Sequence, residues 1–245
     1  MTKTVAIIQA RLGSTRLPGK VLLPLCGKPI IRHIIERVKR AKLLDDVIVA
    51  IPDEKDNGAL KDTIYKSDVG IYTATKLEDR DLIGRYHEAA KFSQATTIVR
   101  VCADNPCIDP NEIDRLIFRY NKNSLGWKVL FSNTHNIQNN GYPDGLGAEI
   151  YDFKFMKWMH ENVKGVDYRE HPHKWAEEQG LVWTIMAPHE IRRPQYKLDV
   201  NTERDYRKLT RIYEAVYPQN NDFRAIDIIR WIDGQNDLAE WSVST

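Results

Sequence analysis

The stretch from Val5 to Lys20 reads VAIIQARLGSTRLPGK and indicates the fold class of the chain. Its first four residues form a short apolar run of the kind that makes a buried parallel strand. The polar residues that follow would leave this strand at its carboxyl end, where open α/β sheets bind their ligands. We therefore expect an α/β fold with a ligand site directly after its first strand.

The polar part of this stretch carries groups that suit a polyphosphate. Glycines allow a tight backbone, hydroxyls donate hydrogen bonds, and guanidinium groups match phosphate oxygens. The predicted nucleotide-binding residues here are Gln9, Ala10, Arg11, Gly13, Ser14, Arg16 and Lys20. No acidic residue precedes Glu36 although the net charge is only +2, which favours a local anionic ligand over a nucleic-acid surface. A solvated basic loop is the alternative interpretation.

Two common phosphate motifs are excluded by their spacing. Five residues separate Gly13 from Gly19, where a Walker A loop has four. Val21 follows Lys20, where that loop has Ser or Thr, and the chain has no Gly-x-Gly-x-x-Gly fingerprint of a dinucleotide site.

The bulk composition is that of a soluble α/β protein. A length of 245 residues suits one domain, with room for an inserted lobe, and 42% hydrophobic and 29% charged residues are ordinary values. No apolar run approaches the roughly 20 residues of a membrane span. Three cysteines, Cys26, Cys102 and Cys107, have no metal-type spacing, so we expect a cytoplasmic protein without disulfides.

The pattern along the chain alternates between strands and helices. Residues 47–51 and 69–72 have the composition of strands, while apolar residues recur with helical period over 30–38 and about 60–65. This order favours a parallel sheet in a three-layer α/β/α arrangement. The ranges 203–216 and 222–232 are predicted to be amphipathic packing helices, followed by a loosely ordered tail from Gly234.

A second informative stretch covers residues 97–106. A β-rich run ends in Asp104, and Pro106 then turns the chain out of the strand. A carboxylate at a strand end opposite a basic loop suits Mg²⁺, and Arg100 lies four residues earlier on the same strand face. Asp104 could instead be an ordinary turn or capping residue.

The third stretch, residues 197–206, contains two further oxygen donors. Leu198 to Asn201 has the composition of a final strand, in which Asp199 and Asn201 would point the same way and face Asp104. Thr202 is predicted to cap the next helix, with Asp205 as its acidic first-turn partner. Asp104, Asp199 and Asn201 are therefore the candidate metal ligands.

These three stretches resemble the motifs of CTP-dependent cytidylyltransferases that activate acidic sugars. The likeness is greatest to the spore-coat-polysaccharide branch, which is related to the sialic acid and ketodeoxyoctonate CMP-sugar synthetases. It implies a nucleotide-diphospho-sugar transferase type of fold, CTP and an acidic-sugar acceptor as substrates, and Mg²⁺ as cofactor. It also implies a homodimer, no nucleic acid or membrane partner, and catalytic roles for Arg11, Lys20, Asp104 and Asp199. Relatives often have Asp at the position of Asn201. The neutral amide of Asn201 would hold a metal ion more weakly than that carboxylate.

The same resemblance places an acceptor and dimerisation lobe at about residues 133–183. The acceptor residues that it suggests are Arg85, Asn133, Asp144, Glu149, Arg169 and His171. Two of these positions have an alternative interpretation: the segment Tyr142 to Gly145 is also a turn signal, and a structural role for His171 stays open. A zinc site at His171 and His173 lacks cysteine partners or helical spacing.

Two other functions remain open from the sequence. Asp79-Arg80-Asp81 is formally the Asp-x-Asp metal motif of nucleotide-sugar glycosyltransferases, but carboxylates at a helix start are the favoured explanation, because no apolar strand precedes the pair. Alternatively, Asn201 could mark a non-catalytic nucleotide-binding subunit. Under the first alternative Asp81→Ala should abolish metal-dependent activity, whereas under cytidylyl transfer Asp104→Ala should.

Overall fold

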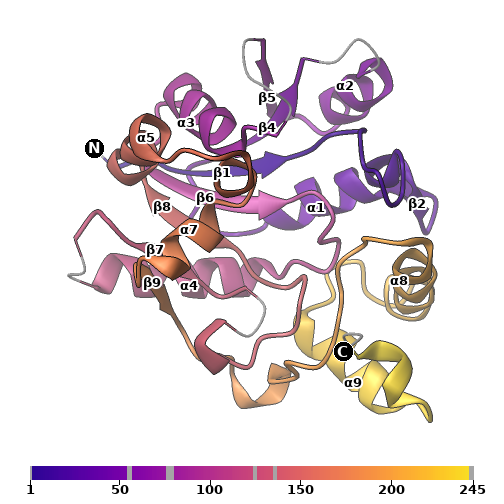
Figure 1. The fold of residues 1–245 in the computed structure, drawn as a ribbon. Coiled ribbons are helices and arrows are strands. Elements are labelled where there is room, and N and C mark those ends of the chain that lie inside the picture. Colours follow the sequence, from indigo (N-terminus) through magenta and orange to yellow (C-terminus); the bar gives the residue numbers. More distant parts are fainter. Residues whose placement is uncertain (1, 54–56, 76–79, 124–125, 135–136, 243–245) are drawn as a thin grey trace.

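A seven-stranded sheet forms the centre of the computed structural model (Figure 1). The structure describes residues 2–53, 57–75, 80–123, 126–134 and 137–242. The strand order is β5-β4-β1-β6-β8-β7-β9, and among the strands within these residues β8 alone runs antiparallel to its neighbours. The strands are β1 (Thr4–Gln9), β4 (Asp46–Pro52), β5 (Gly70–Ala74), β6 (Thr97–Cys102), β7 (Leu130–Ser132), β8 (Glu149–Asp152) and β9 (Val182–Thr184). The expected mostly parallel α/β sheet is confirmed.

Helices cover both faces of the sheet. They are α1 (Ile30–Val38), α2 (Gly58–Tyr65), α3 (Leu82–Ser93), α4 (Pro110–Lys122), α5 (Phe153–Asn162), α6 (Val166–Glu170), α7 (Pro172–Glu178), α8 (Glu203–Val216) and α9 (Ala225–Asp233). Four short 3-10 turns, η1 (Lys20–Leu22), η2 (Ile137–Asn139), η3 (His189–Ile191) and η4 (Leu238–Trp241), and the small hairpin β2 (Pro24–Leu25) and β3 (Lys28–Pro29) complete the described elements.

Alternation along β1 divides the core into two clusters. Ala6 and Ile8 pack with apolar side chains of α1, α2, α4, α8 and α9, whereas Val5 and Ile7 pack with those of α3, α5 and α7. A parallel strand that is buried on both faces has to be continuously apolar, which accounts for the run at Val5 to Ile8. The two clusters produce the predicted three layers.

The sheet reverses its order of growth beside β1. The chain passes from β1 to β4 and β5 on one side, then crosses over to β6 on the other side. The loop after β1 and the segment after β6 therefore leave the sheet at adjacent carboxyl ends, which is where doubly wound folds bind ligands.

Two local predictions were wrong. Leu198 to Asn201 does not form a strand: the chain bends at Asp199, and the described backbone hydrogen bonds of the segment to other parts of the chain are single contacts, such as the Val200 N–H to the Asp104 carbonyl (2.8 Å). The tail also has order, since Trp241 of η4 is fully buried against Trp231. Residues 133–183 supply β8 and β9 to the same sheet, so the segment is continuous with the main core. None of the described helices is long and apolar enough to cross a membrane.

Candidate active site

The loop after β1 is folded tightly on itself. The Leu12 carbonyl accepts hydrogen bonds from the N–H groups of Ser14 (2.8 Å) and Gly19 (3.1 Å), which closes the loop into a compact turn. Gly19 has a φ of 66°, in the left-handed region that glycine adopts without a steric penalty. It directly precedes η1 and so aims Lys20 back over the carboxyl ends of the strands.

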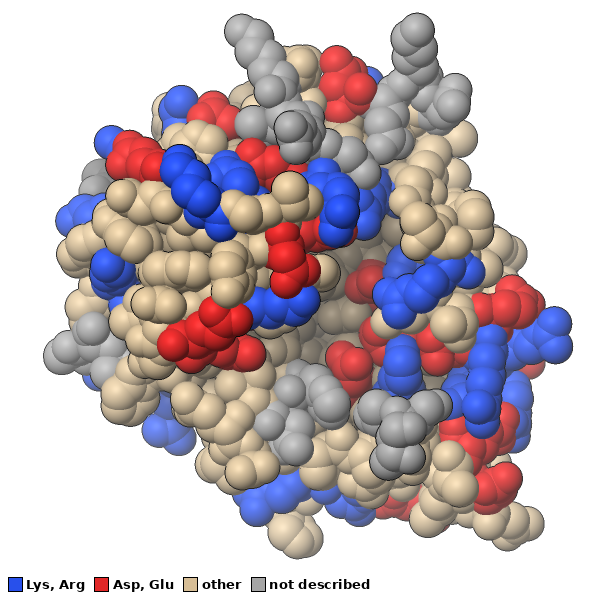
Figure 2. All heavy atoms as spheres, viewed as in Figure 1, with Lys and Arg blue, Asp and Glu red and all other residues tan. Residues whose placement is uncertain are grey.

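A cavity of about 330 Å³ lies beside this loop. Figure 2 shows a hollow in this face of the molecule, with acidic and basic side chains around its rim. The cavity is lined by Gln9, Arg11, Ser14, Thr15, Arg16, Lys20, Val21, Leu82, Arg100, Cys102, Ala103, Asp104, Glu170, His171 and Asn201. A larger groove of about 470 Å³ lies at the opposite, amino-terminal ends of β4 and β5, away from these groups.

Lys20 joins the first, second and third sequence stretches. Its ammonium group donates to Asp104 Oδ2 (2.8 Å), the Val200 carbonyl (2.6 Å) and Asn201 Oδ1 (3.2 Å). Arg16 donates to the same Asn201 oxygen (2.8 Å). Three oxygens from two distant segments thus converge on one cation, and residues 84 or more positions apart in the chain meet at one point.

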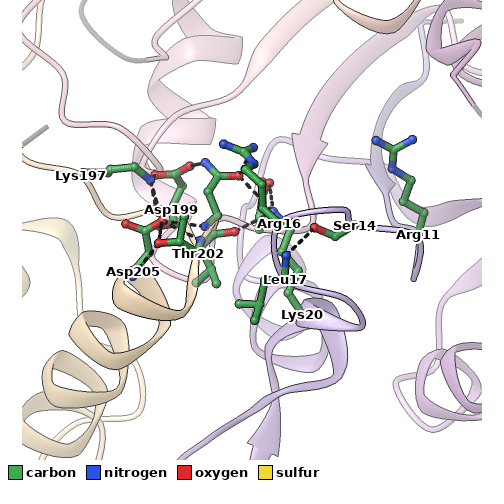
Figure 3. A network of polar contacts seen from close by, with 12 residues as sticks. Arg11, Ser14, Arg16, Leu17, Lys20, Lys197, Asp199, Thr202 and Asp205 are labelled. Carbon is green, nitrogen blue, oxygen red and sulfur yellow. Dashed lines mark hydrogen bonds and ion pairs between the residues drawn. The ribbon is translucent and has the colours of Figure 1, made fainter. Parts of the chain in front are cut away.

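Asn201 links this cluster to a buried carboxylate. Its amide nitrogen donates to Asp199, whose other oxygen contacts Lys197, so both Asp199 oxygens are occupied (Figure 3). Burial and then the Asp144 carboxylate raise the pKa of Asp199 to about 7, against the opposing effect of Lys197. Asp199 reaches the Lys20 cation only through Asn201, and does not line the cavity as a direct ligand would.

The predicted helix cap fixes this segment in place. The Thr202 hydroxyl accepts from the Asp205 N–H (3.3 Å), and the Asp205 side chain accepts from the Thr202 N–H (2.8 Å). Asp205 also accepts from the Asn201 N–H (3.0 Å). Figure 3 shows Thr202 and Asp205 side by side at the start of α8. Because Asp205 holds the backbone of both Asn201 and Thr202, the capping box fixes the backbone from which the Asn201 side chain extends into the site.

Helix α6 contributes a second group of charges. Glu170 accepts from Arg11 (3.2 Å) and contacts Arg80, while Arg169 forms a two-point ion pair with Asp81 (2.9 and 2.8 Å). Asp81 also caps α3 by accepting from the Gly84 N–H (2.9 Å). Burial opposes the charge on Glu170, but the two arginines outweigh it and lower its pKa. Arg11, in contrast to Arg16, lies apart from the Asn201 network (Figure 3).

These contacts show how two residues of the sequence motifs are used. Asp81 caps α3 and pairs with Arg169, which agrees with the helix-start interpretation of the Asp-x-Asp pattern and leaves no free carboxylate at Asp81 for a metal; Asp79 lies outside the described residues. Arg169 is likewise occupied by Asp81 and by the carbonyls of His160 (3.2 Å) and Val163 (3.0 Å), which leaves His171 as the member of this element that reaches the cavity with Glu170.

A buried ion pair forms the floor of the cavity. Arg100 of β6 donates to Glu149 of β8 (2.6 Å), and the Tyr151 hydroxyl donates to the other Glu149 oxygen (2.8 Å). Burial disfavours the charged carboxylate, but Arg100, His173 and Tyr151 outweigh it and lower the pKa of Glu149. Arg100 lines the cavity, whereas Glu149 lies behind it. The predicted acceptor contact of Glu149 therefore becomes a support for Arg100.

The remaining predicted residues are divided between the site and the core. Asn133 is fully buried, donates to the Glu112 carbonyl (3.2 Å) and accepts from the Ala148 N–H (2.8 Å), and it does not line the cavity. Arg85 is 1% exposed within α3 and does not line the cavity either, so an acceptor role for these two residues stays a prediction. Asp144 lies beside Asp199, since its N–H and carbonyl pair with Tyr196 (2.9 Å) and Leu198 (2.9 Å).

Sequence patterns missed Glu170 and Lys197 as members of the site. Glu170 follows Arg169 in a short helix, and its partners are 159 and 90 positions away, so no local signal points to them. Lys197 is the first residue of the third stretch. Its spacing of two from Asp199 could have indicated that the two side chains pair.

The oxygen cluster fits a magnesium ion. Asp104, Asn201 and the Val200 carbonyl are hard oxygen donors, which Mg²⁺ prefers, and they already surround a positive group. Asn201 is neutral, so Asp104 supplies the negative charge in direct contact, while Asp199 holds the Asn201 amide in orientation.

Comparison with known proteins identifies the family. The sequence profile of the cytidylyltransferases matches residues 5–238. The chain belongs to the cytidylyltransferase family. It is 26% identical to the spore coat polysaccharide biosynthesis protein SpsF of Bacillus subtilis, over 98% of both chains. Over 114 residues, 46% of this chain and 43% of the relative, it is 42% identical to the 3-deoxy-manno-octulosonate cytidylyltransferase of Trichlorobacter lovleyi.

A solved structure from the same family has the same architecture. The cytidylyltransferase of Leptospira borgpetersenii superposes with a TM-score of 0.86 at 27% identity, and the match covers 100% of this chain and 99% of that one. The resemblance to cytidylyltransferases is thus confirmed, and the family match over residues 5–238 extends beyond the three stretches at which the sequence motifs are sharp.

Proposed function

We propose that this protein transfers CMP from CTP to an acidic sugar and releases pyrophosphate, for the synthesis of a cell-surface polysaccharide or glycan. The observation that carries the proposal is the convergence of Lys20 and Arg16 with Asp104 and Asn201 at the sheet's switch point. The names of the Bacillus and Trichlorobacter relatives support the acceptor class, since they refer to a coat polysaccharide and to a 3-deoxy-octulosonate.

The chain's own residues would carry out the reaction by positioning and charge neutralisation. The compact loop after β1 offers N–H groups and the Ser14 hydroxyl to the triphosphate, and Arg11, Arg16 and Lys20 offset its charge. An acceptor hydroxyl would attack the α-phosphorus in line, so that a new P–O bond forms, the bond to the pyrophosphate oxygen breaks, and the hydroxyl proton passes to water. A Mg²⁺ ion at Asp104 and Asn201 would supply Lewis-acid stabilisation of the phosphate charge.

The acceptor would approach from the side of α6 and β6. His171 and Arg100 face the cavity there, and the buried Glu149 keeps the Arg100 side chain in place. Arg11 is available to a substrate carboxylate or phosphate if that anion replaces Glu170 as its partner. In this proposal Arg169 positions α6 through Asp81 rather than touching the acceptor.

We also propose a cytoplasmic homodimer assembled through residues 133–183. Trp183 of β9 is 52% exposed at the edge of the sheet, where a short edge strand with an aromatic side chain suits contact with a second copy. Sedimentation of the wild type and of Trp183→Glu would test this assembly. The proposal requires a dimer that Trp183→Glu weakens, and a monomeric wild type would remove it.

Pyrophosphate release with CTP, Mg²⁺ and a panel of 3-deoxy sugar acids tests the proposed reaction. Asp104→Ala should lower turnover by about 100-fold or more, because it removes the charged oxygen that faces the cation site. Asp81→Ala serves as the comparison for metal dependence alone: it removes the α3 cap and the partner of Arg169, which can lower turnover, but it leaves the Asp104 oxygen in place and the remaining turnover should still depend on the metal. Metal dependence that is lost in Asp81→Ala and kept in Asp104→Ala would instead favour the glycosyltransferase alternative.

A further inference from the structure

Lys20 occupies the position that a metal ion would need. Its ammonium group lies 2.6–3.2 Å from the Val200 carbonyl, Asp104 Oδ2 and Asn201 Oδ1. A magnesium ion requires the same oxygens at about 2.1 Å. An ammonium group and a metal ion cannot share these three oxygens, because they would be like charges within a few ångströms.

The contacts of Lys20 also hold it firmly. Its side chain is only 12% exposed, so a lysine that gave up these partners would leave its charge partly buried without compensation. Arg16 adds a second positive group at Asn201 Oδ1 (2.8 Å). A bare divalent cation therefore meets one buried cation in the site and a second one at its edge.

A triphosphate changes this balance. The loop that carries Lys20 also carries Ser14, Arg11 and Arg16 along the same cavity, so a bound triphosphate would offer Lys20 anionic oxygens within reach of its flexible side chain. Lys20 would then lose no charge compensation on leaving Asp104, and the three protein oxygens would become free for a metal.

We propose that Lys20 keeps the cation site closed in the nucleotide-free protein, so that metal binds only with or after the triphosphate. Only the identity of the nucleotide in this inference rests on the proposed function. Lys20 and a divalent ion would compete for the same oxygens in the protein without any substrate.

Titration of the nucleotide-free protein with Mn²⁺, followed by the EPR signal of the free ion, tests the competition. Lys20→Met should bind Mn²⁺ about tenfold more tightly than the wild type, because it removes the competing charge and leaves Asp104 without a partner. Lys20→Arg keeps the charge and should stay at the wild-type affinity. Lys20→Gln serves as a second neutral variant if Lys20→Met does not fold.

Two controls separate this effect from a general change of net charge. Lys28→Met removes a lysine from the same part of the chain that pairs with Glu36 (2.5 Å) and Tyr217 (2.9 Å), and it should leave Mn²⁺ affinity unchanged. Adding Asp104→Asn to Lys20→Met should abolish the gain. Equal affinities of wild type and Lys20→Met, an equal gain in Lys28→Met, or a gain that survives Asp104→Asn would each overturn the proposal. Because no nucleotide is present, failure of CTP turnover would not affect this result.

Discussion

At the scale of single residues, Asn201 is the position where this chain departs from the motif that it resembles. The structure gives the amide a use that a carboxylate does not have. Its oxygen accepts from Arg16 and Lys20, while its nitrogen donates to Asp199. Asp199 and Asn201 together therefore carry one negative charge when Asp199 is ionised. The amide can donate to the carboxylate and accept from the two cations, which a second carboxylate could not do.

Replacing Asn201 by Asp should weaken the site rather than restore it. A carboxylate there would lose the hydrogen bond to Asp199 and place two negative groups in contact, at a cost of about 1–2 kcal/mol. The exchanged variant Asp199→Asn/Asn201→Asp again has one carboxylate and one amide, so it should regain the stability that Asn201→Asp loses. Thermal unfolding and pyrophosphate release of the two variants measure this. A single Asn201→Asp variant that is more stable and more active than the wild type would favour a subunit whose chemistry was lost at this position.

The raised pKa of Asp199 predicts a pH-dependent stability. Because burial and Asp144 raise this pKa to about 7 in the folded protein, the folded state binds a proton that the unfolded state releases near pH 4. The stability due to this group is present below about pH 4 and is lost as the pH rises to about 7. As the pH rises from about 4 to about 7, the free energy of unfolding of Asp199→Asn should therefore increase relative to that of the wild type, by on the order of a few kcal/mol.

Denaturant unfolding at pH 4.5, 6 and 8, without metal or nucleotide, measures that difference. These conditions matter because a bound cation would hold Asp199 ionised and hide the effect. Asp144→Asn provides a second comparison, since removing this carboxylate should lower the pKa of Asp199 and move the loss of stability to lower pH. A constant difference between Asp199→Asn and wild type at all three pH values would contradict the assignment.

At the scale of elements, regular structure was predictable and the irregular segments that complete the site were less so. The range 203–216 was predicted as a helix and is α8 with the same bounds, because its apolar period and its Thr202 cap are both local signals. Leu198 to Asn201 has the composition of a strand but has no neighbouring strand to pair with continuously. The composition of a segment does not show whether a neighbouring strand is present to pair with it.

The turn at Tyr142 to Gly145 packs against the segment that begins at Leu198. Gly145 has a φ of 88°, and a Cβ there would lie 2.6 Å from the Leu198 carbonyl carbon. Gly145→Ala should lower the free energy of unfolding by about 2 kcal/mol or more and displace the Asp199 segment. Gly180→Ala is the matched control, because its φ is also positive (64°) but nothing lies within 4 Å of its Cβ position. Equal losses in the two variants would contradict a role for close packing against Leu198.

At the scale of the whole molecule, the sequence predicted which stretches form the site better than it predicted their individual contacts. The apolar run of β1 and the turn after β6 placed Lys20 and Asp104 at neighbouring strand ends, and the two form an ion pair at 2.8 Å. The partners of Arg169, Glu149 and Asn133 depend on how α6 and β8 pack against the sheet. That packing joins residues from 15 to 88 positions apart, and no spacing rule anticipates it.

The central claim is that the loop after β1 and the oxygens of Asp104 and Asn201 form one site for a triphosphate and its metal. Calorimetric titration of Mg²⁺·CTP into the wild type tests this claim most directly. Arg16→Met and Asp104→Asn should each weaken binding by about tenfold or more, whereas Lys28→Met should not. No binding of CTP to the wild type, or equal affinity in all four proteins, would contradict the account.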